Sequence, residues 1–219
     1  MRNKIFNPKT KKILSLVKTL PYFTLNNLIG IEKDKNYLRI FLYRYEKAGK
    51  IIRLKKGVYT TKEYVDEIQK KGIYSSYQEF LGNSLYEPSY LSLDYVLYEN
   101  NLMTEMPVNF TLITRNKTAV IANAISSYYY HKIKDKLFLG YNIINKDNFT
   151  IYKATKAKAL FDYLYLRKNQ ITNAGNFDEL RLNTENLSKK DLSEFKNYVD
   201  IEGSKKMNKI YLYLKGKND

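Results

Sequence analysis

A long helical pattern followed at once by a basic hairpin constrains the fold more than any other feature of this chain. Asp34 can cap a helix that ends just before Gly49, a residue suited to the left-handed conformation that closes many helices. The β-prone runs Ile51–Leu54 and Val58–Thr60 follow, and Gly57 between them can take the positive φ of a tight turn.

Two shorter helical patterns precede the long one. Apolar residues recur at helical spacing in Lys9–Leu20, with lysines between them, and Pro21 ends the pattern. Thr24 can cap a second, short helix that ends at Gly30. Three helices and a hairpin predict a winged helix-turn-helix. A polar helix over Glu63–Lys71 follows the hairpin and leads out of this unit. We therefore expect a first domain over residues 1–71.

Residues 72–219 predict a larger second domain of class α+β. Helical spacing is present in Tyr77–Leu85, Ser92–Asn101, Thr155–Leu166, Lys189–Val199 and Ser204–Leu214. Strand-like runs occupy Asn109–Thr114, Ser126–His131, Leu137–Ile144 and Phe149–Lys153. This order predicts a mostly antiparallel sheet followed by C-terminal helices. The whole chain is thus expected to be α+β, with the winged helix at its N-terminal end.

The formal net charge of +16 favours a polyanionic partner. The chain is also rich in Lys, Asn, Ile and Tyr, whose codons are A/T-rich, and a biased genome would spread the lysines evenly. Residues 1–71 contain 18 basic and 6 acidic residues, a net charge of +12. The same count is +3 for residues 72–170 and +1 for residues 171–219. This uneven distribution predicts a polyanion site in the first domain.

Composition excludes several classes of protein. Apolar residues make up 44% of the chain, too many for a disordered protein. Cysteine is absent, which excludes disulfides, thiolate metal sites and a cysteine nucleophile. No apolar run approaches the roughly 18 residues of a membrane span, so we expect a soluble, cytoplasmic protein without a membrane partner.

The long helix has one apolar face. If Leu38 marks the centre of the buried side, a rotation of about 100° per residue puts Phe41, Leu42 and Tyr45 on that side. Asn36, Ile40, Tyr43 and Lys47 then face outward, Arg39 and Arg44 flank this outward face, and Lys35 lies in the first turn. The hairpin adds three cations. The predicted DNA-binding residues are Lys35, Asn36, Arg39, Ile40, Tyr43, Arg44, Lys47, Arg53, Lys55 and Lys56.

These residue types suit a recognition helix in the major groove. Arginine can bind guanine with two hydrogen bonds, Asn36 can bind adenine, and Ile40 can contact a thymine methyl group. Lys47 and the hairpin cations Arg53, Lys55 and Lys56 are better suited to phosphates, which position a protein without reading sequence. The alternative is that this outward face is an ordinary solvated helix surface.

Signals for catalysis are weak. The single histidine, His131, has no cysteine or nearby carboxylate to form a metal site or a catalytic pair. Glycine-rich phosphate loops and the short signatures of hydrolases and metalloproteases are absent. We expect no enzyme activity, no cofactor and no metal. Tyr128–Tyr130 could stack on bases, although most of the 22 tyrosines have the spacing of core residues.

Four segments of the chain carry a family resemblance: Leu54–Tyr59 in the hairpin, Pro88–Leu93, the strand Phe110–Arg115, and Lys158–Asp162. In these segments the chain resembles the AbiEi-type antitoxins of type IV toxin–antitoxin (abortive infection) systems. Where that family usually has Pro and Glu before the last segment, this chain has Lys156 and Ala157. No functional acid is therefore carried over at that position.

The resemblance implies a DNA-binding antitoxin. Such a protein represses its own operon by binding repeats in duplex promoter DNA through its winged helix. Its larger domain opposes a nucleotidyltransferase-type toxin, and direct contact with the toxin is left open. The alternative is a stand-alone winged-helix transcriptional regulator whose second domain senses a ligand or dimerises.

Overall fold

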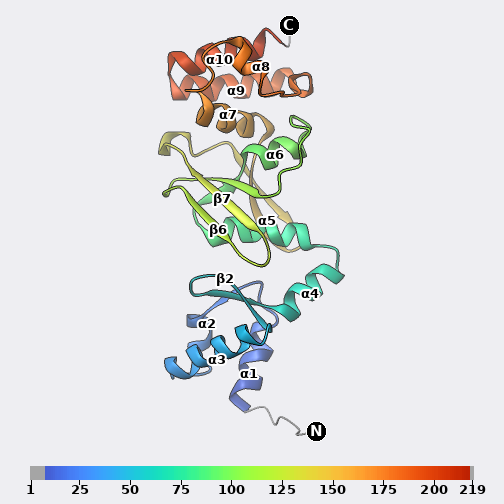
Figure 1. Cartoon of the computed structure of the whole chain (residues 1–219), viewed down its shortest axis with the longest axis vertical. Coiled ribbons are helices and arrows are strands. Elements are labelled where there is room, and N and C mark those ends of the chain that lie inside the picture. Colours follow the sequence, from blue (N-terminus) through green and yellow to red (C-terminus); the bar gives the residue numbers. More distant parts are fainter. Residues whose placement is uncertain (1–7, 218–219) are drawn as a thin grey trace. The chain divides into compact units, whose positions relative to one another are not determined.

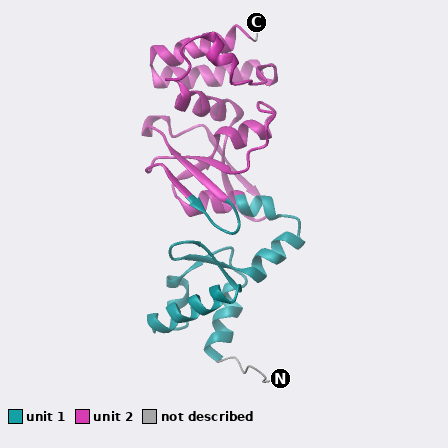
Figure 2. Ribbon diagram, in the orientation of Figure 1, with its two compact units in different colours: residues 1–78, 121–126 teal, residues 79–120, 127–219 magenta. Residues whose placement is uncertain are grey.

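The structure is a computed structural model that describes residues 8–217. The chain forms two compact units (Figure 2). The first unit comprises the residues up to Gln78 together with Ile121–Ser126, and the second comprises Glu79–Val120 and the residues from Ser127 onward. The boundary expected at residue 71 falls inside the first unit. The return of residues 121–126 to that unit was not foreseen.

The first unit contains three helices, a three-stranded antiparallel sheet and a fourth helix that follows the sheet in the sequence (Figure 1). Its elements are α1 (Pro8–Val17), β1 (Phe23–Thr24), α2 (Leu25–Ile29), α3 (Lys35–Lys47), β2 (Ile51–Lys55), β3 (Val58–Thr61) and α4 (Lys62–Lys70). The strand order is β1-β3-β2. Strand β1 was not predicted, because two residues are too few to show an alternating pattern.

Local signals explain the boundaries of α3 and of the hairpin. The Asp34 carboxylate accepts hydrogen bonds from the backbone N–H groups of Asn36 and Tyr37, which would otherwise lack partners at the start of the helix. Gly49 follows the helix with φ +67°, and Gly57 turns the hairpin with φ +78°. Glycine takes these positive φ values without steric cost. The helix and the hairpin therefore lie close to their predicted positions.

The apolar faces of these elements meet in one core. Its fully or almost fully buried members are Ile13, Val17, Phe23, Leu28, Leu38, Phe41, Leu42 and Ile51. Tyr45 is partly buried against this cluster. The face of α3 that was predicted to be buried is therefore the face that packs.

The second unit is built on a six-stranded sheet. Its strands are β4 (Ser89–Leu91), β5 (Phe110–Thr114), β6 (Ala119–Ala122), β7 (Ser127–Lys132), β8 (Tyr141–Lys146) and β9 (Phe149–Ala154), in the order β6-β7-β5-β4-β9-β8. The last two residues of β6 belong to the first unit. Strand β4 pairs antiparallel with β5 and parallel with β9, and β5 pairs parallel with β7.

The sheet is therefore mixed: the expected antiparallel pairing is present between β4 and β5 and between β8 and β9, whereas the parallel pairs β4–β9 and β5–β7 were not predicted. Strand periodicity reports which side chains are buried but not which strand lies alongside. Strands β4 and β6 were missed because they are short. The strand predicted over Leu137–Ile144 is also partly wrong: Leu137 ends a short 3₁₀ helix, and β8 begins only at Tyr141, after Gly140 with φ +78°.

The helices of the second unit are α5 (Tyr74–Leu85, which begins in the first unit), α6 (Leu93–Glu99), α7 (Lys156–Arg167), α8 (Ala174–Asp178), α9 (Lys189–Glu202) and α10 (Lys205–Lys215). The C-terminal helices were predicted from their periodicity, except for the short α8. Ser188 and Ser204 cap α9 and α10. Within residues 8–217, every helix is too short or too polar to cross a membrane.

Candidate nucleic-acid interface

The outward face of α3 is exposed as the sequence predicted. Lys35, Asn36, Arg39, Ile40, Tyr43, Arg44 and Lys47 are all exposed. Ile40 and Tyr43 are 51% and 61% exposed, although both are large apolar side chains. Exposed side chains of this size are also present elsewhere in the chain, for example Ile143 at 63% and Leu212 at 64%.

A groove joins α3 to the hairpin. It has a volume of about 520 Å³, and both Arg39 and Tyr43 of α3 and Arg53 and Lys56 of the hairpin line it. The remaining lining residues are Leu25, Leu42, Glu46, Gly57 and Tyr59. Predicted residues from α3 and from the hairpin, which are separated in the sequence, thus lie around one concave surface. Sequence reasoning missed Glu46, which carries no signal in a single sequence.

The groove distinguishes the two arginines of α3. Arg39 lines it, whereas Arg44 does not, because the hairpin lies on the Arg39 side of the helix. Six of the ten predicted residues lie outside the groove: Lys35, Asn36, Ile40, Arg44, Lys47 and Lys55. Lys55 is half-buried, and the Nζ atom of Lys47 lies 5.7 Å from the centre of the Tyr43 ring.

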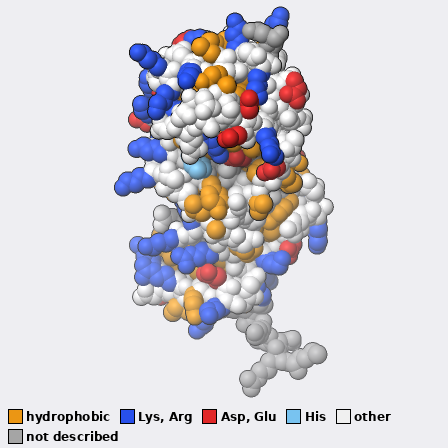
Figure 3. All heavy atoms as spheres, turned by 45° about the horizontal axis from the view of Figure 1, so that its top comes forward, with side chains coloured by type: hydrophobic (Ala, Val, Ile, Leu, Met, Phe, Trp, Pro, Cys, Tyr) orange, Lys and Arg blue, Asp and Glu red, His pale blue; other side chains and the backbone are white. Residues whose placement is uncertain are grey.

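The cations of the groove are available to a ligand. Among residues 8–217, no carboxylate forms a salt bridge with Arg39, Arg53 or Lys56. Lys and Arg side chains gather on one side of the first unit (Figure 3). Exposed cations without acidic partners bind polyanions well, because binding releases counterions and breaks no internal ion pair.

Residues that follow the hairpin in the sequence form hydrogen bonds with the three-stranded sheet and the segment before it. The Tyr77 side chain is fully buried, and its hydroxyl donates to the Pro21 carbonyl oxygen at 2.7 Å and lies 3.1 Å from the Thr60 hydroxyl. Burial raises the pKa of Tyr77. The Asn123 amide donates to the Leu54 carbonyl oxygen at 3.0 Å, so the β6–β7 turn supports strand β2. No local pattern reveals either contact.

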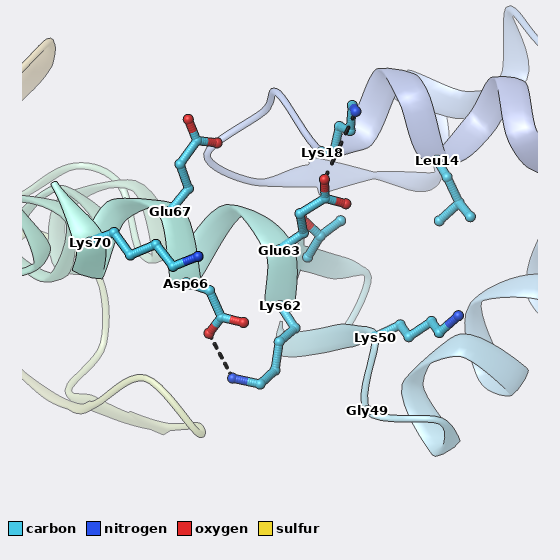
Figure 4. A pocket seen from close by; sticks show the side chains of 10 residues that line it. Leu14, Lys18, Gly49, Lys50, Lys62, Glu63, Asp66, Glu67 and Lys70 are labelled. Atoms are coloured by element: carbon cyan, nitrogen blue, oxygen red, sulfur yellow. Dashed lines mark hydrogen bonds and ion pairs between the residues drawn. The ribbon is translucent and has the colours of Figure 1, made fainter.

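A second hollow in the first unit has a different character. It has a volume of about 610 Å³ and lies between α1, α4 and the Gly49–Lys50 turn (Figure 4). Lys62 pairs with Asp66 at 2.7 Å, and Lys18 lies 3.9 Å from Glu63. Cations and acids largely compensate one another here. The four lysines and three acids that line this hollow give a net charge of +1, whereas three cations and one acid give the groove a net charge of +2.

A buried ion pair lies at the centre of the second unit. The Nζ atom of Lys158 donates to Asp162 at 2.6 Å, and both side chains are completely buried. Asp162 also accepts hydrogen bonds from Tyr90 at 3.0 Å and from Ser92 at 2.8 Å. Burial lowers the pKa of Lys158. Two of the segments that carry the family resemblance thus meet in one buried hydrogen-bond network, to which we assign a role in stability.

His131 lines a surface hollow of about 320 Å³, which the acids Asp94 and Glu105 also line. Met106, Val108 and Tyr129 line this hollow, and hydrophobic side chains are visible next to the histidine (Figure 3). Burial lowers the pKa of His131. Among the described residues, no three His, Asp or Glu side chains are grouped to hold a metal ion. We assign no catalytic role to this region.

No protein-family model matches this chain, and no curated protein matches it either.

Proposed function

We propose that this chain is a DNA-binding antitoxin and transcriptional autorepressor of a type IV toxin–antitoxin operon. In this proposal the first unit is a winged helix-turn-helix, with α3 as recognition helix and the β2–β3 hairpin as wing. The observation that carries it is the groove in which Arg39 and Tyr43 of α3 are joined by Arg53 and Lys56 of the hairpin. The charge distribution supports the same conclusion, because the first unit holds 18 basic and 6 acidic residues.

The residues divide into two roles. Helix α3 has 13 residues and is about 20 Å long, which suits the width and depth of a major groove. Arg39, Asn36 and Tyr43 are assigned to base edges. Arg53 and Lys56 are assigned to phosphates, since a wing beside the recognition helix meets the DNA backbone.

The antitoxin part of the proposal rests on the family resemblance. It assigns to the second unit the task of opposing a nucleotidyltransferase-type toxin encoded by a neighbouring gene. The second unit holds 20 basic and 16 acidic residues, so it is less suited than the first to bind DNA. The division of charge favours separate sites for repression and for antitoxicity.

The test uses the full-length chain and a triple variant, Arg39→Ala, Arg53→Ala and Lys56→Ala. Repression is measured with a reporter behind the operon's own promoter, and antitoxicity by growth during expression of the neighbouring toxin from an independent promoter. We expect the variant to lose repression and to retain growth rescue at equal protein levels.

Three outcomes contradict parts of the proposal. If the wild-type chain does not repress its promoter or bind the promoter DNA, the DNA-binding assignment is wrong. If it represses but does not rescue growth, the chain is a stand-alone regulator. If the triple variant loses both activities while it remains folded, the two functions share one surface.

A further inference from the structure

Glu46 is the one acidic residue that lines the groove between α3 and the hairpin. The other charged residues in its lining are Arg39, Arg53 and Lys56. On α3, Arg39, Tyr43 and Glu46 follow one another at intervals of four and three residues, so they share one helix face. A carboxylate therefore lies on the surface that is otherwise built to attract phosphates.

Glu46 has no ion pair among the described residues that would hold its side chain within the first unit. Among residues 8–217, no salt bridge joins Glu46 to a cation, and the side chain is half-buried. Glu46 also lies in the last turn of α3, where the helix dipole disfavours negative charge. Neither an ion pair nor the helix dipole stabilises the carboxylate within the unit, so Glu46 is available to a ligand of the groove that it lines.

The chemistry of the groove limits what that ligand group can be. A carboxylate only accepts hydrogen bonds, and it repels phosphate oxygens. In the major groove, the base edges that donate are the amino groups of cytosine and adenine, and the usual partner of Glu or Asp is the cytosine amino group. Adenine is better matched by Asn or Gln, which can accept from its amino group and donate to its ring nitrogen.

We infer that Glu46 is a specificity-determining residue whose carboxylate accepts a hydrogen bond from the amino group of a cytosine in the major groove. This inference rests on the proposed DNA-binding function. Along the helix axis, Glu46 lies about 10 Å from Arg39, so the two side chains contact different base pairs. The same carboxylate weakens the hold of the groove on DNA that lacks this cytosine.

The experiment compares the full-length wild-type chain with Glu46→Gln. Duplexes are selected from a randomised library at about 150 mM salt, and the affinities of the selected duplex and of a scrambled duplex are measured by fluorescence anisotropy. Glu63→Gln is the matched control, because it removes the same charge from an exposed residue of the same unit, outside the groove. Thermal unfolding checks that each variant is folded, and Glu46→Ala provides a second variant.

We expect wild-type selection to return a fixed cytosine, and Glu46→Gln to lose that preference. The ratio of affinities for selected and scrambled duplex should fall about tenfold, within the range that one base contact contributes. The affinity for the scrambled duplex should rise more in Glu46→Gln than in Glu63→Gln. Glu46→Ala should also lose the cytosine.

Two results overturn the inference in different ways. If folded Glu46→Gln and Glu46→Ala keep the wild-type preference at every position, or if Glu63→Gln changes selectivity as much, then Glu46 does not determine specificity although the chain binds DNA. If the wild-type chain selects no duplex at all, the proposed function itself is wrong, and this inference fails with it.

Discussion

The ammonium group of Lys158 lies 2.6 Å from the carboxylate of Asp162, and neither side chain is exposed to solvent. The two residues are one turn apart on α7, and Tyr90 and Ser92 hold the same carboxylate from the β4 region. The pair therefore connects a helix to the centre of the sheet. Removal of one partner should be much more harmful than the loss of a surface ion pair.

The first prediction concerns this pair. Asp162→Asn leaves the Lys158 ammonium without a charged partner in a dry site, so the free energy of unfolding should fall by about 3–5 kcal/mol. Asp200→Asn is the matched control, because Asp200 pairs with Lys196 at the same spacing on α9 but is exposed. It should change stability by no more than about 0.5 kcal/mol. Urea unfolding of the full-length chain measures both, and equal losses would contradict the structural role.

The second prediction concerns Tyr77, whose hydroxyl contacts Pro21 and Thr60 within the first unit. Tyr77→Phe removes the hydroxyl that bonds to the half-buried Pro21 carbonyl oxygen and lies within hydrogen-bonding distance of the buried Thr60 hydroxyl. The full-length chain should lose about 1–3 kcal/mol of stability. Tyr129→Phe, on an exposed ring, should change stability by less than about 0.5 kcal/mol. A Tyr77→Phe protein as stable as the wild type would show that this contact does not support the unit.

The third prediction separates base reading from phosphate binding. Arg39→Ala should lower the affinity for the promoter duplex relative to a scrambled one by about 5- to 150-fold, which is the contribution of one base contact. Lys56→Ala should weaken binding to both duplexes about equally and should reduce the slope of log affinity against log salt by about one. Titrations at several salt concentrations measure both effects. The same pattern of loss in both variants would refute the division of roles.

The fourth prediction concerns pH. Burial lowers the pKa of His131 in the folded chain, whereas the unfolded chain binds a proton near pH 6.5. Between these two pKa values the unfolded state binds more protons, so His131 makes the folded state less stable as the pH falls below about 7. His131→Gln should reduce the loss of thermal stability between pH 7.5 and 5.5. Because the chain has one histidine, an identical loss in both proteins would exclude this effect.

Much of the first unit was predictable because its signals are local. Asp34, Gly49 and Gly57 act through their own backbone and its nearest neighbours, so the boundaries of α3 and of the hairpin could be predicted from residue type. The periodicity of α3 also determined which side chains are exposed. The seven predicted α3 residues are all exposed, while Leu38, Phe41 and Leu42 are buried.

The tertiary structure alone decided which of these exposed residues meet. The hairpin lies beside Arg39 and not Arg44, and it brings Glu46 into the groove, because the side on which a hairpin packs depends on the whole core. Strand neighbours are likewise non-local, so the parallel pairing of β5 with β7 left no signal in either strand.

The burial of the charged pair Lys158 and Asp162 could not be predicted from the sequence either. Lys158 has the appearance of a surface lysine on α7, and only the fold brings Tyr90 and Ser92 to its partner Asp162. A charged side chain can be buried only where partners from distant segments replace the water that it loses. Local residue types therefore determined the elements and their exposed faces, whereas long-range packing determined the groove, the mixed sheet and the buried pair.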